Sequence, residues 1–336
     1  MRVVVRALAE WTGAACHQHR IEKFAPTSMG LARSAIQLIA ETIRDHRISG
    51  RVLIIGKQDV WGTEIEVIRW LRECGLTPAA CATRISLKPD FQRLNFIQDT
   101  SLFELMGFRE AVTLDYSDYE GADVICDLNH PLPEGLLAKT GPFDLIIDSG
   151  CLEHIFNVPQ VLRNYYHLAG DSGAVICIVP SSNLVDHGFY NFSPTLFQDY
   201  YSANHWQVLR HYLFQNFPNC NRRWKIYEYK PGALMAFASA GGLGRAIWGI
   251  YVAAQKQPGA TCDAQVQQGM FLRAWNTAAG RERPGQDAMA KSGWLALRAR
   301  LKPHVPKSLI PLLMTIEAKF KTAGGIPRYL ERHRHP

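Results

Sequence analysis

The sequence predicts an α/β fold in which helices cover both faces of a mostly parallel, doubly wound sheet. Short apolar runs, typical of strands buried on both faces, alternate with stretches whose apolar residues recur at helical spacing. Three of the predicted strands end in a carboxylate, at Asp115, Asp127 and Asp148. Parallel strands bring their carboxyl ends to one edge of a sheet, where ligands bind in open α/β folds. These acids therefore mark the predicted site.

The chain begins with a predicted helix over 27–46, which Gly50 ends. A buried strand follows over 51–56, then a loop, then an amphipathic helix over 63–74. This order of strand, loop and helix is that of the start of a mononucleotide-binding unit. The glycine signal in the loop is weak, because only Gly56 and Gly62 are present.

An insertion over 76–110 separates this unit from the next strand. It carries a stretch of basic and aromatic residues and a predicted short helix over 101–106. An insertion of this size beside a ligand site is either a lid or substrate surface, or structural cover for the edge of the sheet. The sequence favours neither.

The strand over 143–148 is the centre of the prediction. Leu145, Ile146 and Ile147 form its apolar run, which carboxylates flank and Gly150 ends. The other elements predicted after the insertion are strands over 111–115, 122–127, 174–180, 206–214 and 247–256, and helices over 158–168 and 194–201.

Composition divides the chain into four parts. A helical segment over 1–50 precedes the main domain over 51–256, which contains the insertion. Residues 257–290 are rich in Gly, Gln, Ala and Pro without clear period and are predicted to be a linker. Residues 291–336 are predicted to form a basic amphipathic helical tail.

The positive charge of the chain lies in its last residues. The net charge is +7, but residues 281–336 hold twelve Lys and Arg against four Asp and Glu, so the rest carries −1. A near-neutral main domain does not favour nucleic acid as a partner. The basic tail either packs on the domain, which we favour, or contacts an anionic membrane surface or another protein.

The eight cysteines are scattered and none has CxxC spacing, which indicates reduced, buried thiols and favours the cytoplasm. The run Cys16-His17-Gln18-His19 has no partner cluster in the sequence, so no metal site is predicted. Glu10 interrupts the N-terminal apolar run too early for a signal peptide. The longest apolar stretch, 233–255, contains Arg245 and is predicted to be loop and strand rather than a membrane helix.

The order of these motifs resembles class I S-adenosylmethionine-dependent methyltransferases of the small-molecule type. The resemblance covers about 51–256, and four segments carry it: 113–117, 124–133, 143–154 and 167–173. They resemble the second, third and fourth strands of that family with their ends, and the turn before its fifth strand. The resemblance implies a Rossmann-like methyltransferase fold with S-adenosylmethionine as cofactor.

The resemblance also implies roles for individual residues. Gly56 would let the backbone approach the methionyl part, and Asp115 would accept from the ribose hydroxyls. Asp127 and Leu128 would meet the adenine edge. Asp148 and Gly150 would lie near the methionyl amino group and the reacting methyl.

Two histidines follow the fourth and fifth strands, and either could take a proton from an acceptor. We prefer His187 as the general base, because the loop over 181–193 is rich in polar and aromatic side chains. His154 is the second candidate, although a hydrogen-bonded structural role is the simpler reading for it. Glu153 could orient the loop or touch the cofactor.

The predicted reaction is methyl transfer to an O or N nucleophile of a small molecule or glycoconjugate. Aromatic residues near the expected mouth would suit a sugar, an aromatic or a lipid-linked acceptor: Tyr190, Phe192, Trp224 and Tyr227. The main alternative is a binding or scaffold protein on the same fold, because the loop after Gly56 lacks the usual glycines.

Two other enzyme classes are disfavoured. A nicotinamide oxidoreductase would need GxGxxG after the first strand and an acid about 20 residues later, and both are absent. A Cys–His hydrolase built on Cys151 and His154 lacks a recognisable third group.

Overall fold

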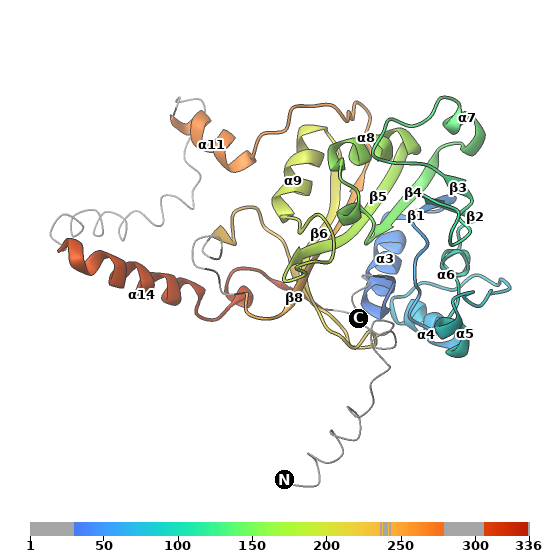
Figure 1. Ribbon diagram of the computed structural model, residues 1–336, viewed down its shortest axis with the longest axis horizontal. Coiled ribbons are helices and arrows are strands. Elements are labelled where there is room, and N and C mark those ends of the chain that lie inside the picture. Colours follow the sequence, from blue (N-terminus) through green and yellow to red (C-terminus); the bar gives the residue numbers. More distant parts are fainter. Residues whose placement is uncertain (1–29, 236, 238–240, 242, 279–305, 335–336) are drawn as a thin grey trace, which may run out of the picture.

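A nine-stranded sheet forms the centre of the molecule (Figure 1). The computed structural model describes residues 30–334 except 236, 238–240, 242 and 279–305. From one edge to the other, the strands are β3 (Val124–Ile125), β2 (Glu110–Asp115), β1 (Arg51–Ile55), β4 (Phe143–Ser149), β5 (Ala169–Ser182), β8 (Ile247–Gln255), β6 (Gln207–Asn216), β7 (Lys225–Glu228) and β9 (Arg332–His333).

The first five strands of the sheet are parallel, in the order β3-β2-β1-β4-β5. The chain passes from β1 outward to β3 and then returns to β4 on the other side of β1, so a topological switch point lies between β1 and β4. Next to β5 stands β8, which is antiparallel to both of its neighbours, β5 and β6. The predicted Rossmann-like fold with a parallel core is confirmed, whereas the sheet as a whole is mixed, since all pairings from β5 to β9 are antiparallel.

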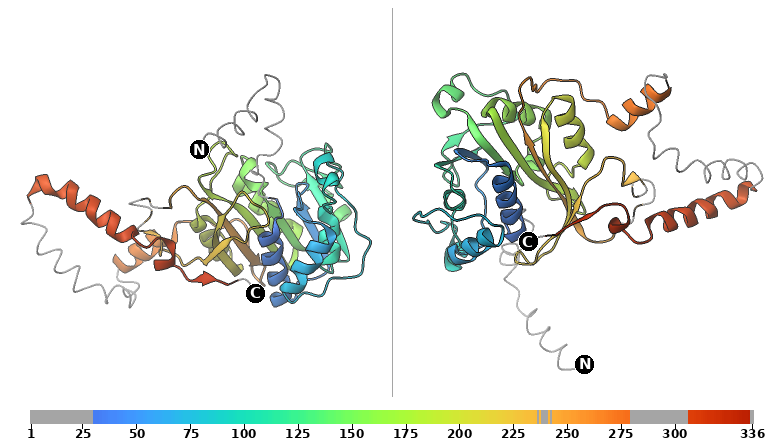
Figure 2. Two further views of the ribbon diagram at one scale, coloured as in Figure 1. Left: turned by 90° about the horizontal axis from the view of Figure 1, so that it is seen from below. Right: turned by 180° about the vertical axis from the view of Figure 1, so that it is seen from behind.

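Helices cover both faces of the sheet. The first face carries α3 (Arg33–His46), α4 (Glu64–Glu73) and α6 (Asp99–Leu105), and the second carries α8 (Val158–Leu168) and α9 (Pro194–Ala203). Alternation along β1 serves both cores, since Val52 and Ile54 face the first set and Leu53 and Ile55 the second. Figure 2 shows α3 and α4 at the end of the molecule opposite to α14 (Ile310–Thr322).

Local sequence accounts for where several helices begin. Thr63 and Glu66 form a capping box at the start of α4. The Ser193 hydroxyl accepts from the amide of Thr195 at the start of α9, whose first residue is Pro194. Helix α3 begins at Arg33, and residues 27–29 of the helix predicted over 27–46 lie outside the described residues.

The insertion contributes to the core of the domain. It contains α5 (Pro89–Arg93) and α6, and the side chains of Leu102 and Phe103 in α6 are fully buried. β2 and β3 are joined by a short loop without a helix, and α6, which precedes β2 in the chain, packs on β2 instead. The long connection from β1 to β2, residues 56–109, thus supplies cover for the sheet.

Several elements extend the prediction. Strand β5 begins at Ala169 rather than 174, and α7 (Leu136–Thr140) and β7 were not expected. Helix α11 (Gly269–Ala278) falls within the range predicted as a linker. In the tail, η4 (Lys307–Leu309) precedes α14 and η5 (Ile326–Arg328) follows it. The chain then returns to the sheet as β9, which pairs with β7.

Three further sequence predictions concern membrane helices, the state of the cysteines and the Cys–His run near the N-terminus. Among the described residues, no helix has the length and apolar character needed to cross a membrane. The seven cysteines of the described part are all free thiols. The run Cys16–His19 lies outside the described residues.

Candidate functional site

The turn after β1 requires a glycine. Gly56 has a φ of +67°, and its amide donates to the Leu114 carbonyl at 2.7 Å. A Cβ at this position would collide with Sγ of Cys151, whose thiol lies 3.3 Å from the Ile55 carbonyl oxygen that it bonds. The end of β1 therefore packs directly against the loop after β4.

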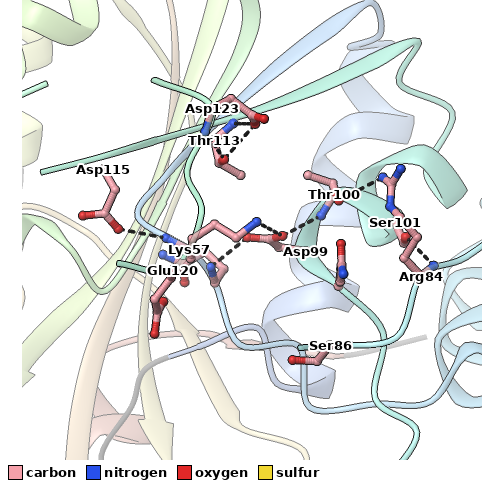
Figure 3. Close-up of polar contacts among 12 residues, drawn as sticks. Lys57, Arg84, Ser86, Asp99, Thr100, Ser101, Thr113, Asp115, Glu120 and Asp123 are labelled. Atoms are coloured by element: carbon pink, nitrogen blue, oxygen red, sulfur yellow. Dashed lines mark hydrogen bonds and ion pairs between the residues drawn. The ribbon is translucent and has the colours of Figure 1, made fainter. Parts of the chain in front are cut away.

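Asp115 lies beside this turn, at the end of β2 (Figure 3). Its carboxylate accepts from the amides of Lys57 (3.3 Å) and Tyr116 (2.6 Å). An ionised carboxylate has roughly four acceptor positions, and the residue is only half buried. Asp115 can therefore still accept from hydroxyl groups of a ligand.

The loop after β1 is held by the insertion. Lys57 Nζ lies 3.2 Å from Asp99 Oδ1, and the Gln58 amide donates to Asp99 Oδ2 at 2.9 Å (Figure 3). Lys88 bridges Asp59 at 2.8 Å and Glu120 at 2.9 Å. Ion pairs and hydrogen bonds from polar side chains thus hold the loop after β1, which lacks the glycines that the resemblance led us to expect there.

Asp127 and Leu128 follow β3. Asp127 Oδ1 accepts from the amide and the side-chain nitrogen of Asn129, each at 2.9 Å, and the backbone hydrogen bond from Asn129 lowers the pKa of Asp127. The side chain of Leu128 is buried. Asp127 stays partly exposed at the same edge of the sheet as Asp115.

Asp148, at the end of β4, is fully buried. Its carboxylate accepts from the amides of Cys151 (2.9 Å) and Leu152 (3.3 Å) and from the Tyr165 hydroxyl. Burial raises the pKa of Asp148 to about 6. In contrast to the expected contact with a methionyl amino group, this carboxylate fixes the loop after β4. Gly150, with a φ of +96°, makes the turn of that loop.

Glu153, His154 and His187 form a second cluster, which joins the loop after β4 to the loop after β5. One ligand-type atom from each side chain lies within 4.8 Å of the other two, and the imidazole centroids are 5.0 Å apart. Glu153 is fully buried in the 3₁₀ helix η2 (Leu152–His154), whereas His154 is exposed. Within the described part of the chain, neither carboxylate oxygen of Glu153 has a hydrogen-bond partner.

The loop after β5 folds tightly over Glu153. The Phe189 amide donates to the Glu153 carbonyl at 2.8 Å, and a Cβ at Gly188 would lie 2.9 Å from that same oxygen. Glycine at 188 thereby lets this loop approach, and it brings His187 Nε2 to 3.5 Å from Glu153 Oε1. The two predicted histidines are thus brought together.

The aromatic residues beside this cluster differ from those expected. Phe192, Trp224 and Tyr227 are buried in the core, and only Tyr190 of the predicted set is partly exposed. Phe156 and Phe189 are exposed instead, with ring centroids 5.7 Å apart. They were missed because sequence alone does not reveal that two loops far apart in the chain meet here.

The Cys–His hydrolase alternative finds no support in the structure. Burial raises the pKa of the Cys151 thiol well above its ordinary value. The reactive form of cysteine is the thiolate, so this thiol is a structural group that packs on Gly56.

The structure was compared with solved structures. A 1,6-didemethyltoxoflavin-N1-methyltransferase from Burkholderia thailandensis is 13% identical with a TM-score of 0.32, over 67% of this chain and 79% of that one. An O-methyltransferase of a Brevibacillus brevis polyketide synthase is 12% identical with a TM-score of 0.33, over 76% and 81%. A putative methyltransferase from Bacillus halodurans is 9% identical with a TM-score of 0.36, over 65% and 98%.

With TM-scores below 0.5, these likenesses do not by themselves identify the activity of this chain. The sequence matches no protein-family model, and no curated protein matches it either. The functional argument therefore depends on the residues of the chain itself.

Proposed function

We propose that this protein is an S-adenosylmethionine-dependent methyltransferase that acts on an O or N nucleophile of a small molecule or glycoconjugate. The observation that carries the proposal is the switch point between β1 and β4, where the partly free carboxylate of Asp115 lies beside the turn at Gly56. The antiparallel β8 between β5 and β6 departs from the strand order of dinucleotide-binding folds and so argues against a nicotinamide enzyme.

The residues at this edge fit the nucleoside part of the cofactor. Asp115 retains acceptor positions for a ribose diol, and the partly exposed Asp127 offers a polar edge for a base. At the methionyl end, Gly56 makes the turn after β1, and Cys151 Sγ occupies the space over it. Asp148 supports this end by fixing the loop that carries Gly150 and Cys151.

The cofactor, when bound, supplies a methyl group already activated on a sulfonium. The protein then has to place the acceptor and remove its proton. His187 and His154 lie at the ends of β5 and β4 and are the proposed groups for that task, with His187 as the base. The exposed rings of Phe156 and Phe189 give the acceptor an apolar surface to lie on.

A second candidate function is a binding or scaffold protein that does not use the cofactor. The observation that favours it is the loop after β1, in which Lys57 and Gln58 are tied to Asp99 and Cys151 fills the space over Gly56. The two functions differ in one measurable property, which is affinity for the cofactor.

Calorimetric titration with S-adenosylmethionine tests the proposal. We expect saturable binding that weakens about tenfold or more in Asp115→Ala, because a ribose hydroxyl would lose a charged acceptor worth about 1.5–3 kcal/mol. Asp118→Ala is the matched control, since Asp118 is an exposed acid in the same loop. No binding at millimolar cofactor by the folded protein would favour the scaffold function.

The C-terminal tail is proposed to contact an anionic membrane surface. Helix α14 exposes large apolar side chains, among them Leu312, Leu313 and Met314, and carries the exposed Lys319. Cosedimentation with vesicles rich in phosphatidylserine tests this contact. Equal binding to neutral vesicles at all salt concentrations would contradict the electrostatic part of the proposal.

A further inference from the structure

We propose that Glu153, His154 and His187 bind a divalent transition-metal ion, and that this ion engages an oxygen of the methyl acceptor. The metal site itself stands on the geometry of these three residues alone. The role toward the acceptor rests on the function proposed above.

The carboxylate of Glu153 supplies the first argument. It is fully buried, and neither oxygen has a hydrogen-bond partner among the described residues. A buried carboxylate without a partner costs several kcal/mol, so such groups are normally paired or coordinate a metal. The nearest cationic candidate is His187, whose Nε2 is 3.5 Å from Oε1, which is longer than an ordinary hydrogen bond.

The geometry of the cluster supplies the second argument. Three atoms within 4.8 Å of one another leave a point that is no more than about 2.8 Å from each. Zinc–nitrogen and zinc–oxygen bonds are about 2.0–2.2 Å long. Small side-chain rotations would therefore complete the coordination. His154 is exposed and the side chain of His187 is 15% exposed, so solvent can reach the histidine side of the cluster.

The kind of donor indicates the kind of ion. Two imidazoles and one carboxylate suit zinc, iron, cobalt or manganese, whereas calcium and magnesium prefer oxygen ligands alone. Three protein ligands leave coordination positions for a water or a substrate, as in catalytic sites. The nearest thiol, Cys151, is engaged with the Ile55 carbonyl and supplies no soft ligand.

The site has a direct consequence for the substrate. A bound cation lowers the pKa of an oxygen that it contacts, so the acceptor class is an alcohol or phenol rather than an amine. With the metal bound, His187 is a ligand and no longer the base. The hydroxyl proton passes to solvent, the oxygen forms a bond to the methyl carbon, and the carbon–sulfur bond breaks with its electron pair going to sulfur. The exposed rings of Phe156 and Phe189 would hold the apolar part of such an acceptor.

Metal binding by the chelator-treated full-length protein is the test. Zn²⁺ is titrated by calorimetry and Co²⁺ by its visible absorption, with no cofactor present. We expect one ion per chain and about a tenfold or larger loss of affinity in both Glu153→Gln and His187→Gln. His167→Gln, an exposed histidine on α8 away from the cluster, should bind like the parent protein.

The variants also separate this site from the histidines of residues 16–19, because binding there would be unaffected by either substitution. Circular dichroism establishes that each variant folds, and His187→Gln alone decides the question if Glu153→Gln does not. Absence of one-to-one binding, or equal affinity in the parent and the substituted proteins, overturns the site.

Titration of the same samples with S-adenosylmethionine distinguishes the two proposals. Metal binding without cofactor binding leaves the metal site standing and removes its role in methyl transfer. Cofactor binding without metal binding overturns the metal site alone and leaves His187 as the proposed base.

Discussion

The loop after β1 and the loop after β4 lie side by side at the switch point. Each is associated with a buried carboxylate, and the two carboxylates differ in their hydrogen-bond partners. Asp99, which anchors the first loop, is 2% exposed and has Lys57, the Gln58 amide and the Thr100 amide as partners. Glu153, at the end of the second loop, has no hydrogen-bond partner in the described part of the chain. The first arrangement fixes a loop, whereas the second leaves a charge available to a ligand.

Asp148 shows that the contrast is not a matter of burial. It lies five residues before Glu153 and is equally buried, yet it accepts three hydrogen bonds from the protein. Two buried carboxylates five residues apart, one in β4 and one in η2, therefore have separate tasks. Asp148, which accepts hydrogen bonds from the protein, fixes the loop after β4. The Glu153 carboxylate, which accepts none among the described residues, is available to a ligand.

The largest expected effect comes from breaking the contact between the two loops. Gly56→Ala should lower the free energy of unfolding by about 2–4 kcal/mol, because it combines a left-handed backbone with a collision against Cys151. Urea denaturation measures the change. Adding Cys151→Ala should restore the part due to the collision, and no recovery in the double variant would show that the loops are not in contact here.

The second effect concerns Asp148 and depends on pH. Burial raises its pKa to about 6, above the roughly 3.9 of an unfolded chain, so the native state holds the proton more tightly. The contribution of Asp148 to stability is therefore greatest below about pH 4 and is lost as the pH rises through about 6. Asp148→Asn should gain about 2 kcal/mol relative to the parent between pH 4 and pH 7.

Urea denaturation of both proteins across this pH range measures the difference in their free energies of unfolding. The other titrating groups contribute equally to both proteins and cancel in that difference. Asp118→Asn, at an exposed acid, should show no such gain. If the difference in free energy of unfolding between Asp148→Asn and the parent did not change with pH, ionisation of Asp148 would carry no cost in the native state.

The smallest effects test the contrast itself and have opposite signs. Asp99→Asn should lower stability by about 1–3 kcal/mol, because Lys57 loses its charged partner. Glu153→Gln, measured with a chelator present, should raise stability by about 1–2 kcal/mol, because it removes a buried charge that has no hydrogen-bond partner among the described residues and lies 3.5 Å from His187 Nε2. If both variants lost the same amount of stability, Asp99 and Glu153 would not differ in the way proposed.

The central strands were predictable from sequence because that part of the sheet is buried on both faces, whereas β7 and β9 were not expected. Short apolar runs such as Leu145–Ile147 are typical of strands buried on both faces of a sheet. The side chains of Thr63 and Ser193 cap the helices that follow them, and residues of this kind indicate where a helix begins. The extent of β5 was underestimated, because the turn residues Asp171 to Gly173 are incorporated in the strand.

The candidate site was only partly predictable. Strand ends located Asp115 and both histidines, since topology alone brings them to one edge. The isolation of Glu153 and the exposure of Phe156 depend on how the loop after β5 folds over η2, and no local pattern records such a contact. Trp224 was misplaced for the same reason, because it stacks on Phe214 in the core.

The pairing of β9 with β7 determines when the sheet is completed. The two strands are separated by about 100 residues, so joining them costs about 3 kcal/mol more chain entropy than closing a short hairpin. Burial of Ile326 and Leu330, at about 1.5–3 kcal/mol for each side chain, can offset that cost. Until those two residues dock, β7 remains an open edge on which another chain could add a strand. The pairing of β9 thus covers an edge of β7 that could otherwise take a strand from another chain.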